Sequence, residues 1–386
     1  MNDNLFQPIE DFASDILGGV ANLLGYEARE LSAPPADGQV TLPEDLFAQP
    51  FAQTEWWYYT GHCTTETGRE FGFEFVFFKR RTDHDQLGPV PLRMLGNPMY
   101  FAHFAISDID TKKFRYEHIR SLGRMLDLPV VMSEKSYDLQ LAEWSIREVA
   151  GRHVLHATLN DGLIFDAVVE ATKPIVLNGN GGITTKKDGA SKHFSFTRMS
   201  VAGQFTEKGS IETFSGSAWM DREFGSWEQT NWDWFSIQFN DETELMLYIF
   251  QDETGAFNGE STGTFVDRDG TCTYLGEDDF DVSVRSSWVS AGTGAAYPAH
   301  WDIRVESLGI EIEVEPLIDD QELDTRGTTM IIYWEGACSV IGSRSGAPIN
   351  GRAYVELVGY DRSHETMGLG DFLFGSTIRR VKEILA

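Results

Sequence analysis

Cysteine is scarce in this chain. Only Cys63, Cys272 and Cys338 occur among 386 residues, and they lie far apart with no CxxC or CxxH spacing. This pattern argues against a disulfide framework and against a cysteine-based zinc site. Thiols without partners are typical of a reducing compartment, so we expect a cytoplasmic protein.

Basic residues are few, and long apolar runs are missing. The chain has 31 Lys and Arg against 60 Asp and Glu, which gives a formal net charge of −29. A protein that binds nucleic acid needs a basic face, so that class is excluded, and anionic lipid is a poor partner for the same reason. No stretch of roughly 18 uncharged apolar residues is present, so no transmembrane helix is expected. The acidic N-terminus has no apolar core of a secretory signal.

Motifs for common cofactors and nucleophiles are also lacking. No GxSxG elbow, P-loop or GxGxxG follows a predicted strand. His153 and His156 are three positions apart, which places them on opposite faces of a strand and argues against a metal pair. We therefore expect neither a cofactor nor a metal.

Short strand patterns separated by turns fill the chain from Glu55 onward. EWWYYTGHC and REFGFEFVFFKR form the first hairpin pattern, and similar segments recur at regular spacing to about residue 360. This predicts an all-β fold, a sandwich or barrel. Helical patterns occur only in residues 1–26 and 372–386. The terminal helices could dock on the β-body, bind a partner or contact a membrane surface, and docking is favoured because the first is acidic.

A weak internal repeat indicates two β-domains. The aromatic segment 56–59 and its acidic turn resemble the segment 232–235 and the turn that follows it. A loop rich in Gly, Asn and Lys over 174–192 is the expected boundary. We predict an N-terminal helix and lead-in at 1–50, β-domains at 51–190 and 191–365, and a C-terminal helix at 366–386.

One stretch, residues 215–250, concentrates charge and indole rings. Asp221, Arg222 and Glu223 lie between Trp219 and Phe224. Charges in such apolar surroundings cost several kcal/mol unless they are paired or used in function. If the segment is extended, Asp221 and Glu223 share one side and Arg222 faces the other.

Several sequence blocks together resemble one family. The chain is similar, from about Glu55 to Tyr360, to the lipocalin-like superfamily of AttH-like proteins and carotenoid 1,2-hydratases, in the blocks EWWYYTGH, GFEFVFFKR, SGSAWMDREFGSW, WDWFSIQFNDETELMLY, YWEG and GRAYVELVGY. The resemblance implies two consecutive lipocalin-like β-domains, a small hydrophobic ligand of polyene or prenyl type, and no redox cofactor or metal. It also implies that Asp221 is the residue that protonates a double bond. The sequence of the motif around Asp221 is closer to the AttH-like branch than to the pigment-pathway hydratases.

The chemistry of alkene hydration fits residues in these blocks. A carboxylic acid kept neutral by an apolar pocket can protonate the double bond, and aromatic faces can stabilise the cation that develops, by roughly 0.5 to 2 kcal/mol each. The catalytic candidates are Asp221 and Glu223. The candidates for substrate binding are Trp57, Tyr59, Trp219, Trp232, Trp234, Tyr333 and Glu335. Glu335 and Glu74 are carboxylates inside apolar strands, and for them pairing in the core is favoured over catalysis.

Three functions remain open from the sequence. The first is a cofactor-free hydratase, or a related lyase or Diels–Alderase-like cyclase, that acts on an isoprenoid, carotenoid-like or polyene substrate. The second is a lipocalin-like carrier of an apolar ligand without chemistry. The third is a structural β-protein whose termini recruit a membrane or partner. The substrate, the direction of reaction and the oligomeric state are left open.

Overall fold

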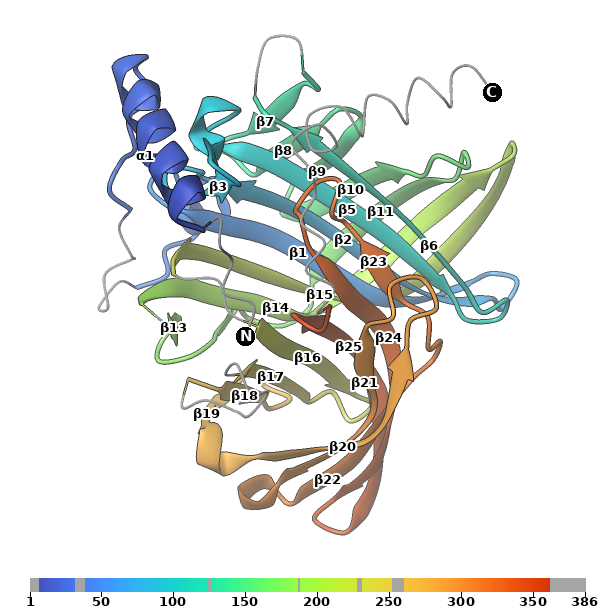
Figure 1. Cartoon of the computed structure of the whole chain (residues 1–386). Helices are drawn as coiled ribbons and strands as arrows, with labels where there is room; N and C mark the ends of the chain where they lie inside the picture. Colours follow the sequence, from blue (N-terminus) through green and yellow to red (C-terminus); the bar gives the residue numbers. More distant parts are fainter. Residues whose placement is uncertain are drawn as a thin grey trace.

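Strands make up most of the molecule, as the sequence predicts. The computed structural model describes residues 7–31, 39–123, 127–186, 188–227, 231–251 and 260–361, and the predicted C-terminal helix at 366–386 lies outside them. Within these ranges there is one α-helix, α1 (Gln7–Leu23), and four single-turn 3-10 helices, η1 (Glu44–Leu46), η2 (Leu92–Met94), η3 (Glu277–Asp279) and η4 (Glu306–Leu308). The all-β expectation of two lipocalin-like β-domains is confirmed (Figure 1).

The first sheet curls into a nearly closed antiparallel barrel (Figure 1). Its strand order is β6-β5-β2-β1-β15-β14-β11-β10-β9-β8-β7, with β12 and β13 paired to β14. The strands are β1 (Thr54–Thr65), β2 (Glu70–Arg80), β5 (Met99–Asp108), β6 (Lys113–Ser121), β7 (Val130–Met132), β8 (Asp138–Leu141), β9 (Trp144–Val149), β10 (Arg152–Thr158), β11 (Ile164–Ala171), β12 (Val176–Leu177), β13 (Ile183–Lys186), β14 (Gly189–Glu207) and β15 (Ser210–Ser226). A separate hairpin joins β3 (Gln86–Leu87) to β4 (Val90–Pro91).

The second sheet forms a half-barrel below the first. Its order is β19-β18-β17-β16-β25-β24-β22-β21-β20, with β23 paired to β24. The strands are β16 (Asn231–Phe239), β17 (Glu244–Gln251), β18 (Thr262–Val266), β19 (Cys272–Gly276), β20 (Asp281–Val289), β21 (Ala296–Val305), β22 (Ile310–Pro316), β23 (Glu322–Asp324), β24 (Ile332–Arg344) and β25 (Ala347–Val358).

The sheets divide later in the chain than the predicted boundary at residue 190. Strand β15 pairs with β1 from Thr54 opposite Gly225 to Thr65 opposite Phe214, so both β14 and β15 belong to the first sheet. The Gly-rich segment that suggested a linker instead holds β12 and β13, which pair with β14. The change of sheet occurs between β15 and β16, within the aromatic stretch itself.

Alternation along each strand separates a filled interior from an outer face. On β1, Trp57 and Tyr59 are fully buried in the barrel core, among Phe73, Phe75 and Phe104. Trp56 and Tyr58 point the other way and pack in a separate cluster with residues of the second sheet. The half-barrel has a core of its own, built on Phe235, Ile237, Leu247 and Trp301 among others. Both concave interiors are therefore occupied by side chains.

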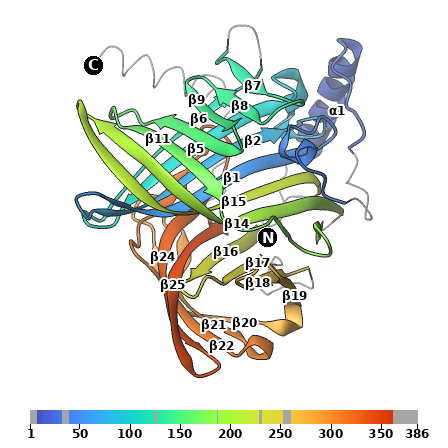
Figure 2. The ribbon, with the colours of Figure 1, turned by 180° about the vertical axis from the view of Figure 1, so that it is seen from behind.

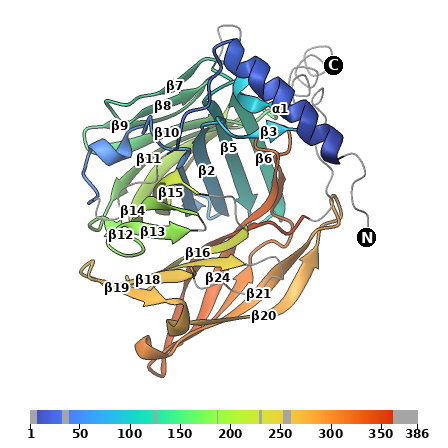
Figure 3. The ribbon, with the colours of Figure 1, turned by 60° about the vertical axis from the view of Figure 1, so that its left-hand side comes forward.

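The two sheets pack through their outer faces. Tyr58, Val76 and Trp219 of the first sheet contact Trp234, Met246 and Tyr248 of the second in one buried cluster. The glycine at position 72 on β2 permits close approach, because a Cβ there would lie 2.7 Å from the Cβ of Ala337. Figures 2 and 3 show β14 and β15 above β16, with the half-barrel curving away beneath.

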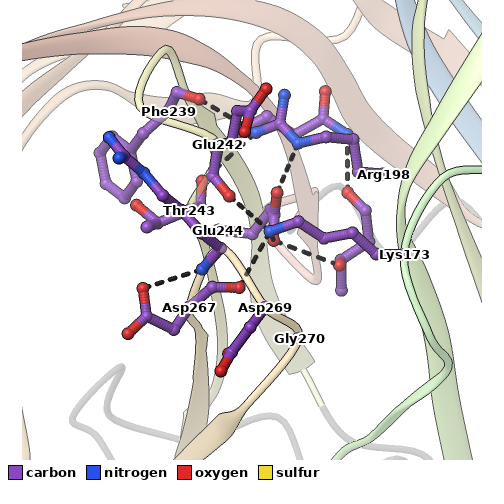
Figure 4. Close-up of polar contacts among 12 residues, drawn as sticks. Lys173, Arg198, Phe239, Glu242, Thr243, Glu244, Asp267, Asp269 and Gly270 are labelled. Atoms are coloured by element: carbon purple, nitrogen blue, oxygen red, sulfur yellow. Dashed lines mark hydrogen bonds and ion pairs between the residues drawn. The ribbon is translucent and has the colours of Figure 1, made fainter.

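A buried ion-pair cluster links the sheets at one edge (Figure 4). The carboxylate of Glu244 on β17 is ion-paired with Arg198 of β14, at 2.5 Å from its Nε, and with Lys173 in the turn after β11, at 2.9 Å from its Nζ. Arg198 also donates to the carbonyls of Phe239 and Thr243, and Lys173 to those of Glu242 and Asp267. Because Lys173 and Arg198 belong to the first domain and Glu244 to the second, this cluster connects the two domains.

Helix α1 runs through Gly18 and Gly19 without a break, and Arg93 contacts its C-terminal end. Arg93 donates to the carbonyls of Gly18 and Tyr26 and to the side chain of Asn22. A cation at this end of a helix also complements the helix dipole. Ala21 is buried, whereas Ile16, Val20, Leu23 and Leu24 are exposed on the chain itself, and docking of this face on a partner chain stays a prediction. No helix in the described ranges has the length and apolar character that a membrane crossing requires.

Candidate functional site

Strand register brings polar residues into rows on the outer face of the first barrel. Asp221 on β15 lies opposite Ser195 on β14 and opposite Tyr58 on β1, and the row continues through Val76 to His103 on β5. One row along, Glu223 lies between His193 and Trp56. Pairs that are far apart in sequence thus become neighbours because antiparallel pairing puts same-face residues side by side.

The second sheet presents a matching row. Trp234 on β16 is flanked by Tyr248 on β17 and by Glu356 on β25, and Glu335 on β24 lies opposite Glu356. In the parallel row, Trp232 and Tyr333 are separated only by Val358. This face meets the Asp221 row of the first barrel across the domain interface.

A cavity of about 300 Å³ lies between the two faces. Polar side chains from both sheets line it, among them Asp221, Glu223, Glu356, His103, His193, Tyr58, Tyr248 and Tyr333, together with Thr54, Lys79, Arg80, Thr82, Asp85, Gln86 and Thr329. Its aromatic lining includes Trp56, Trp227, Trp232, Trp234, Phe78 and Phe101. The exposed Gln86 lies at its rim, so the cavity reaches the surface. An apolar cavity with few convergent polar groups is the usual form of a small-molecule site.

Asp221 is buried on this wall, and its carboxylate is engaged by three donors. Oδ1 accepts the hydroxyl of Ser195 and the indole N–H of Trp219, the latter at 2.7 Å, and Oδ2 lies 2.9 Å from His193 Nε2. The sequence argument expected apolar surroundings for this side chain, whereas the structure places a hydroxyl, an indole N–H and an imidazole around its carboxyl group.

The pKa of His193 depends on its burial and on the carboxylates beside it. Burial alone would lower its pKa, but the carboxylates of Glu223 and Asp221 outweigh burial and raise the pKa of His193 above its ordinary value. An imidazolium beside Asp221 is thereby favoured at the cavity wall.

Glu223 lines the same cavity but is committed to another partner. Its Oε1 lies 2.5 Å from Lys186 Nζ and also accepts the Ser191 hydroxyl. The Lys186 ammonium sits over the ring of Trp227, 3.9 Å from its centroid, and over that of Tyr248 at 4.8 Å. Burial lowers the pKa of Lys186, while Glu223 acts in the opposite direction. Glu223 is therefore placed as the counter-ion of a caged lysine.

Two tyrosines complete the polar lining. Tyr333 and His103 share a 2.7 Å hydrogen bond, and burial lowers the pKa of His103, so its imidazole is neutral. Tyr58 donates to Glu335 Oε1 at 2.5 Å. Burial raises the pKa of Glu335, and the nearby Glu356 and Glu74 raise it further. Among the described residues, no group of three or more His, Cys, Asp or Glu is arranged to hold a metal ion.

The predicted site residues divide into three groups. Asp221, Glu223, Trp232, Trp234 and Tyr333 line the cavity. Trp219 and Glu335 lie just behind its wall and touch it through Asp221 and Tyr58.

Trp57 and Tyr59 are not brought to the cavity. Trp57 Nε1 donates to the Leu46 carbonyl inside the first barrel, and the Tyr59 hydroxyl bonds to Tyr137 and His153 there. The sequence separated the two faces of this strand correctly, but it could not show which face meets the second domain. The residues that do so are Trp56 and Tyr58.

Arg222 lies where alternation placed it, away from Asp221. It is fully buried, ion-paired to Glu55, and its guanidinium is 4.0 Å from the ring centroid of Trp57. The positive charge of Arg222 is thus paired with Glu55 inside the first barrel.

His193 and Glu356 are among the cavity residues that sequence reasoning missed. His193 lies on β14, and only pairing of β14 with β15 places it beside Asp221. Glu356 stands in the apolar segment AYVELV and offered the same signal that drew attention to Glu335, a carboxylate among β-branched and aromatic residues.

Comparison with known proteins agrees with this architecture. The family model of AttH-like proteins matches residues 33–360. The crystal structure of a protein assigned as AttH from Nitrosomonas europaea is 28% identical, with a TM-score of 0.75, and covers 86% of this chain and all of its own. Kievitone hydratase from Nectria haematococca has the same fold at 17% identity, with a TM-score of 0.66 and coverage of 86% and 96%. No curated protein matches the chain.

Proposed function

The chain belongs to the AttH-like family, and on that premise we propose that it is a hydro-lyase that adds water to, or removes it from, a carbon–carbon double bond of an apolar substrate. The observation that carries the proposal is the Asp221–His193 pair on the wall of an aromatic cavity between the domains. A solved structure with this fold is that of a hydratase.

The proposed reaction begins with proton transfer from the pair. The proton held between Asp221 and His193 goes to one alkene carbon, and a cation develops on the neighbouring carbon. The hydrogen bonds from Ser195 and Trp219 keep Asp221 Oδ1 occupied. This leaves Oδ2 and the imidazole as the groups that exchange the proton.

The aromatic walls support the second half of the step. Trp232 and Trp234 present ring systems to the cavity, and an aromatic face stabilises a nearby cation by roughly 0.5 to 2 kcal/mol. Water then adds to the cationic carbon and loses one proton, which completes the alcohol. The substrate class we propose is an isoprenoid, carotenoid-like or other polyene chain, since six tryptophan and phenylalanine rings line the cavity.

The test is turnover of prenyl compounds in water enriched in heavy oxygen. We expect geraniol, farnesol or lycopene to gain a labelled hydroxyl group, detected by mass spectrometry. Asp221→Asn should lower kcat by about 10²- to 10⁴-fold, the usual contribution of general acid catalysis. Quenching of tryptophan fluorescence should show ligand binding nearly unchanged, because the lost interaction acts in the transition state.

Glu311→Gln provides the matched control, since this carboxylate is exposed on the far sheet. It should leave turnover unchanged. If these compounds bind but are never converted, the carrier function is correct instead. Equal turnover by Asp221→Asn and the native protein would remove Asp221 from the mechanism.

A further inference from the structure

Glu356 brings a second carboxyl group into the cavity, from the opposite domain. It lies on β25 between Trp234 of β16 and Glu335 of β24. Its Oε2 accepts the indole N–H of Trp232 at 3.0 Å, and its side chain is half-buried at the cavity wall. Asp221 and Glu356 thus face one space from two different sheets.

Glu356 differs from the other carboxylates that carry a structural role. Glu55, Glu223 and Glu244 are each ion-paired with a lysine or arginine. Across the described residues, the structure pairs Glu356 with no cation. A carboxyl that is not neutralised by a fixed partner stays free to gain and lose a proton at the cavity.

The charged and titratable groups around Glu356 come from both sheets. Burial raises its pKa to about 7, the Trp232 hydrogen bond and Lys186 oppose this shift, and Asp221 and Glu223 add to it. Further groups whose charge it feels or influences are Glu74, Glu335, Tyr58, Tyr248 and Tyr333. A base with such a pKa can take a proton near neutral pH and return it.

Glu74 and Glu335 are poor candidates for the same role. Both are fully buried and neither lines the cavity. Tyr58 stands between Glu335 and the cavity, donating to its Oε1.

We propose that Glu356 is the second acid–base residue of this site, which removes the proton from the water that attacks the substrate. This inference rests on the proposed hydro-lyase function. As the C–O bond forms, an O–H bond of the water breaks and its proton goes to the Glu356 carboxylate, while the Asp221–His193 pair supplies the proton on the neighbouring carbon. In the reverse direction, protonated Glu356 gives its proton to the leaving hydroxyl, which departs as water. Proton exchange with solvent through the rim of the cavity then returns Glu356 and the Asp221–His193 pair to their starting protonation states.

The experiment compares Glu356→Gln with Glu311→Gln in the same turnover assay with geraniol, farnesol and lycopene. We expect Glu356→Gln to lower kcat by about 10²- to 10⁴-fold with little change in KM. In the native protein, hydration should fall off as pH drops through about 7, since the base must be ionised. The same decrease below pH 7 should remain in Glu311→Gln, whose carboxylate is exposed on the far sheet. Glu356→Ala should regain activity when formate is added, which a purely structural role would not produce.

A substrate-free measurement guards against misfolded variants. The indole N–H resonance of Trp232 should titrate near pH 7 in the native protein and at lower pH in Asp221→Asn, because the Asp221 carboxylate raises the pKa of Glu356. It should not titrate in Glu356→Gln. If the native protein converts a prenyl compound and Glu356→Gln keeps the same rate and pH profile, the inference is overturned while the hydro-lyase proposal stands. If the native protein converts none of them, both proposals fall together.

Discussion

Replacing Glu244 by Gln should cost much more stability than any exposed charge change. The substitution keeps the shape of the side chain but leaves Arg198 and Lys173 without their carboxylate between the two sheets. Removing one partner of a buried ion pair costs about 3 to 5 kcal/mol. Here the Arg198 side chain is 21% exposed, and both cations keep carbonyl acceptors, so we expect about 2 to 3 kcal/mol.

The matched control is Glu311→Gln, which breaks the ion pair between Glu311 and Arg304. The side chains of these two residues are 62% and 61% exposed, respectively. Exposed pairs contribute little. Urea unfolding followed by circular dichroism should show a clearly lower midpoint for Glu244→Gln and a nearly native one for Glu311→Gln. Equal midpoints for the two variants would refute the idea that this cluster holds the domains together.

Three further outcomes follow from other side chains of the structure. Asp233 is buried, and burial raises its pKa to about 7, so the folded state keeps a proton that the unfolded state releases near pH 4. The free energy of unfolding should therefore fall by at most about 4 kcal/mol between pH 4 and 7. Urea titration at several pH values should show a smaller decrease in Asp233→Asn. Trp57→Ala should cost about 3 to 5 kcal/mol in thermal unfolding, whereas Trp56→Ala should mainly weaken binding of the apolar dye ANS. Arg93→Met should release helix α1, seen as faster proteolysis after Leu24 with ANS binding unchanged.

Local pattern predicted the elements and their faces, because alternation and turn residues act over a few positions. The strand at Trp56 and Trp57 was identified with both faces separated, and Arg222 was correctly placed opposite Asp221. Which face meets the other domain depends on how two sheets pack, and no short-range pattern encodes that. The same limit explains the boundary at residue 190, since only pairing with β1 assigns β15 to the first sheet.

The electrostatics of the site were the least predictable part. The motif around Asp221 predicted a residue of the cavity wall, yet two of the groups that contact its carboxyl oxygens are Ser195 and His193, more than 20 positions earlier. Glu356 lies 135 positions after Asp221 and reaches the same cavity only because β25 pairs with β16. Protonation states depend on such distant neighbours, so they become visible only when the strands are in register.

The position of the cavity has a consequence for how proteins of this architecture diverge. Each barrel interior is completed by its own apolar side chains, and the chamber is formed by surfaces that neither interior needs. Exchanging an indole for a smaller ring at the Trp56 or Trp232 position therefore reshapes the chamber without opening a hole in either core. The lining of the chamber can therefore change during evolution on one set of residues while another set maintains the fold.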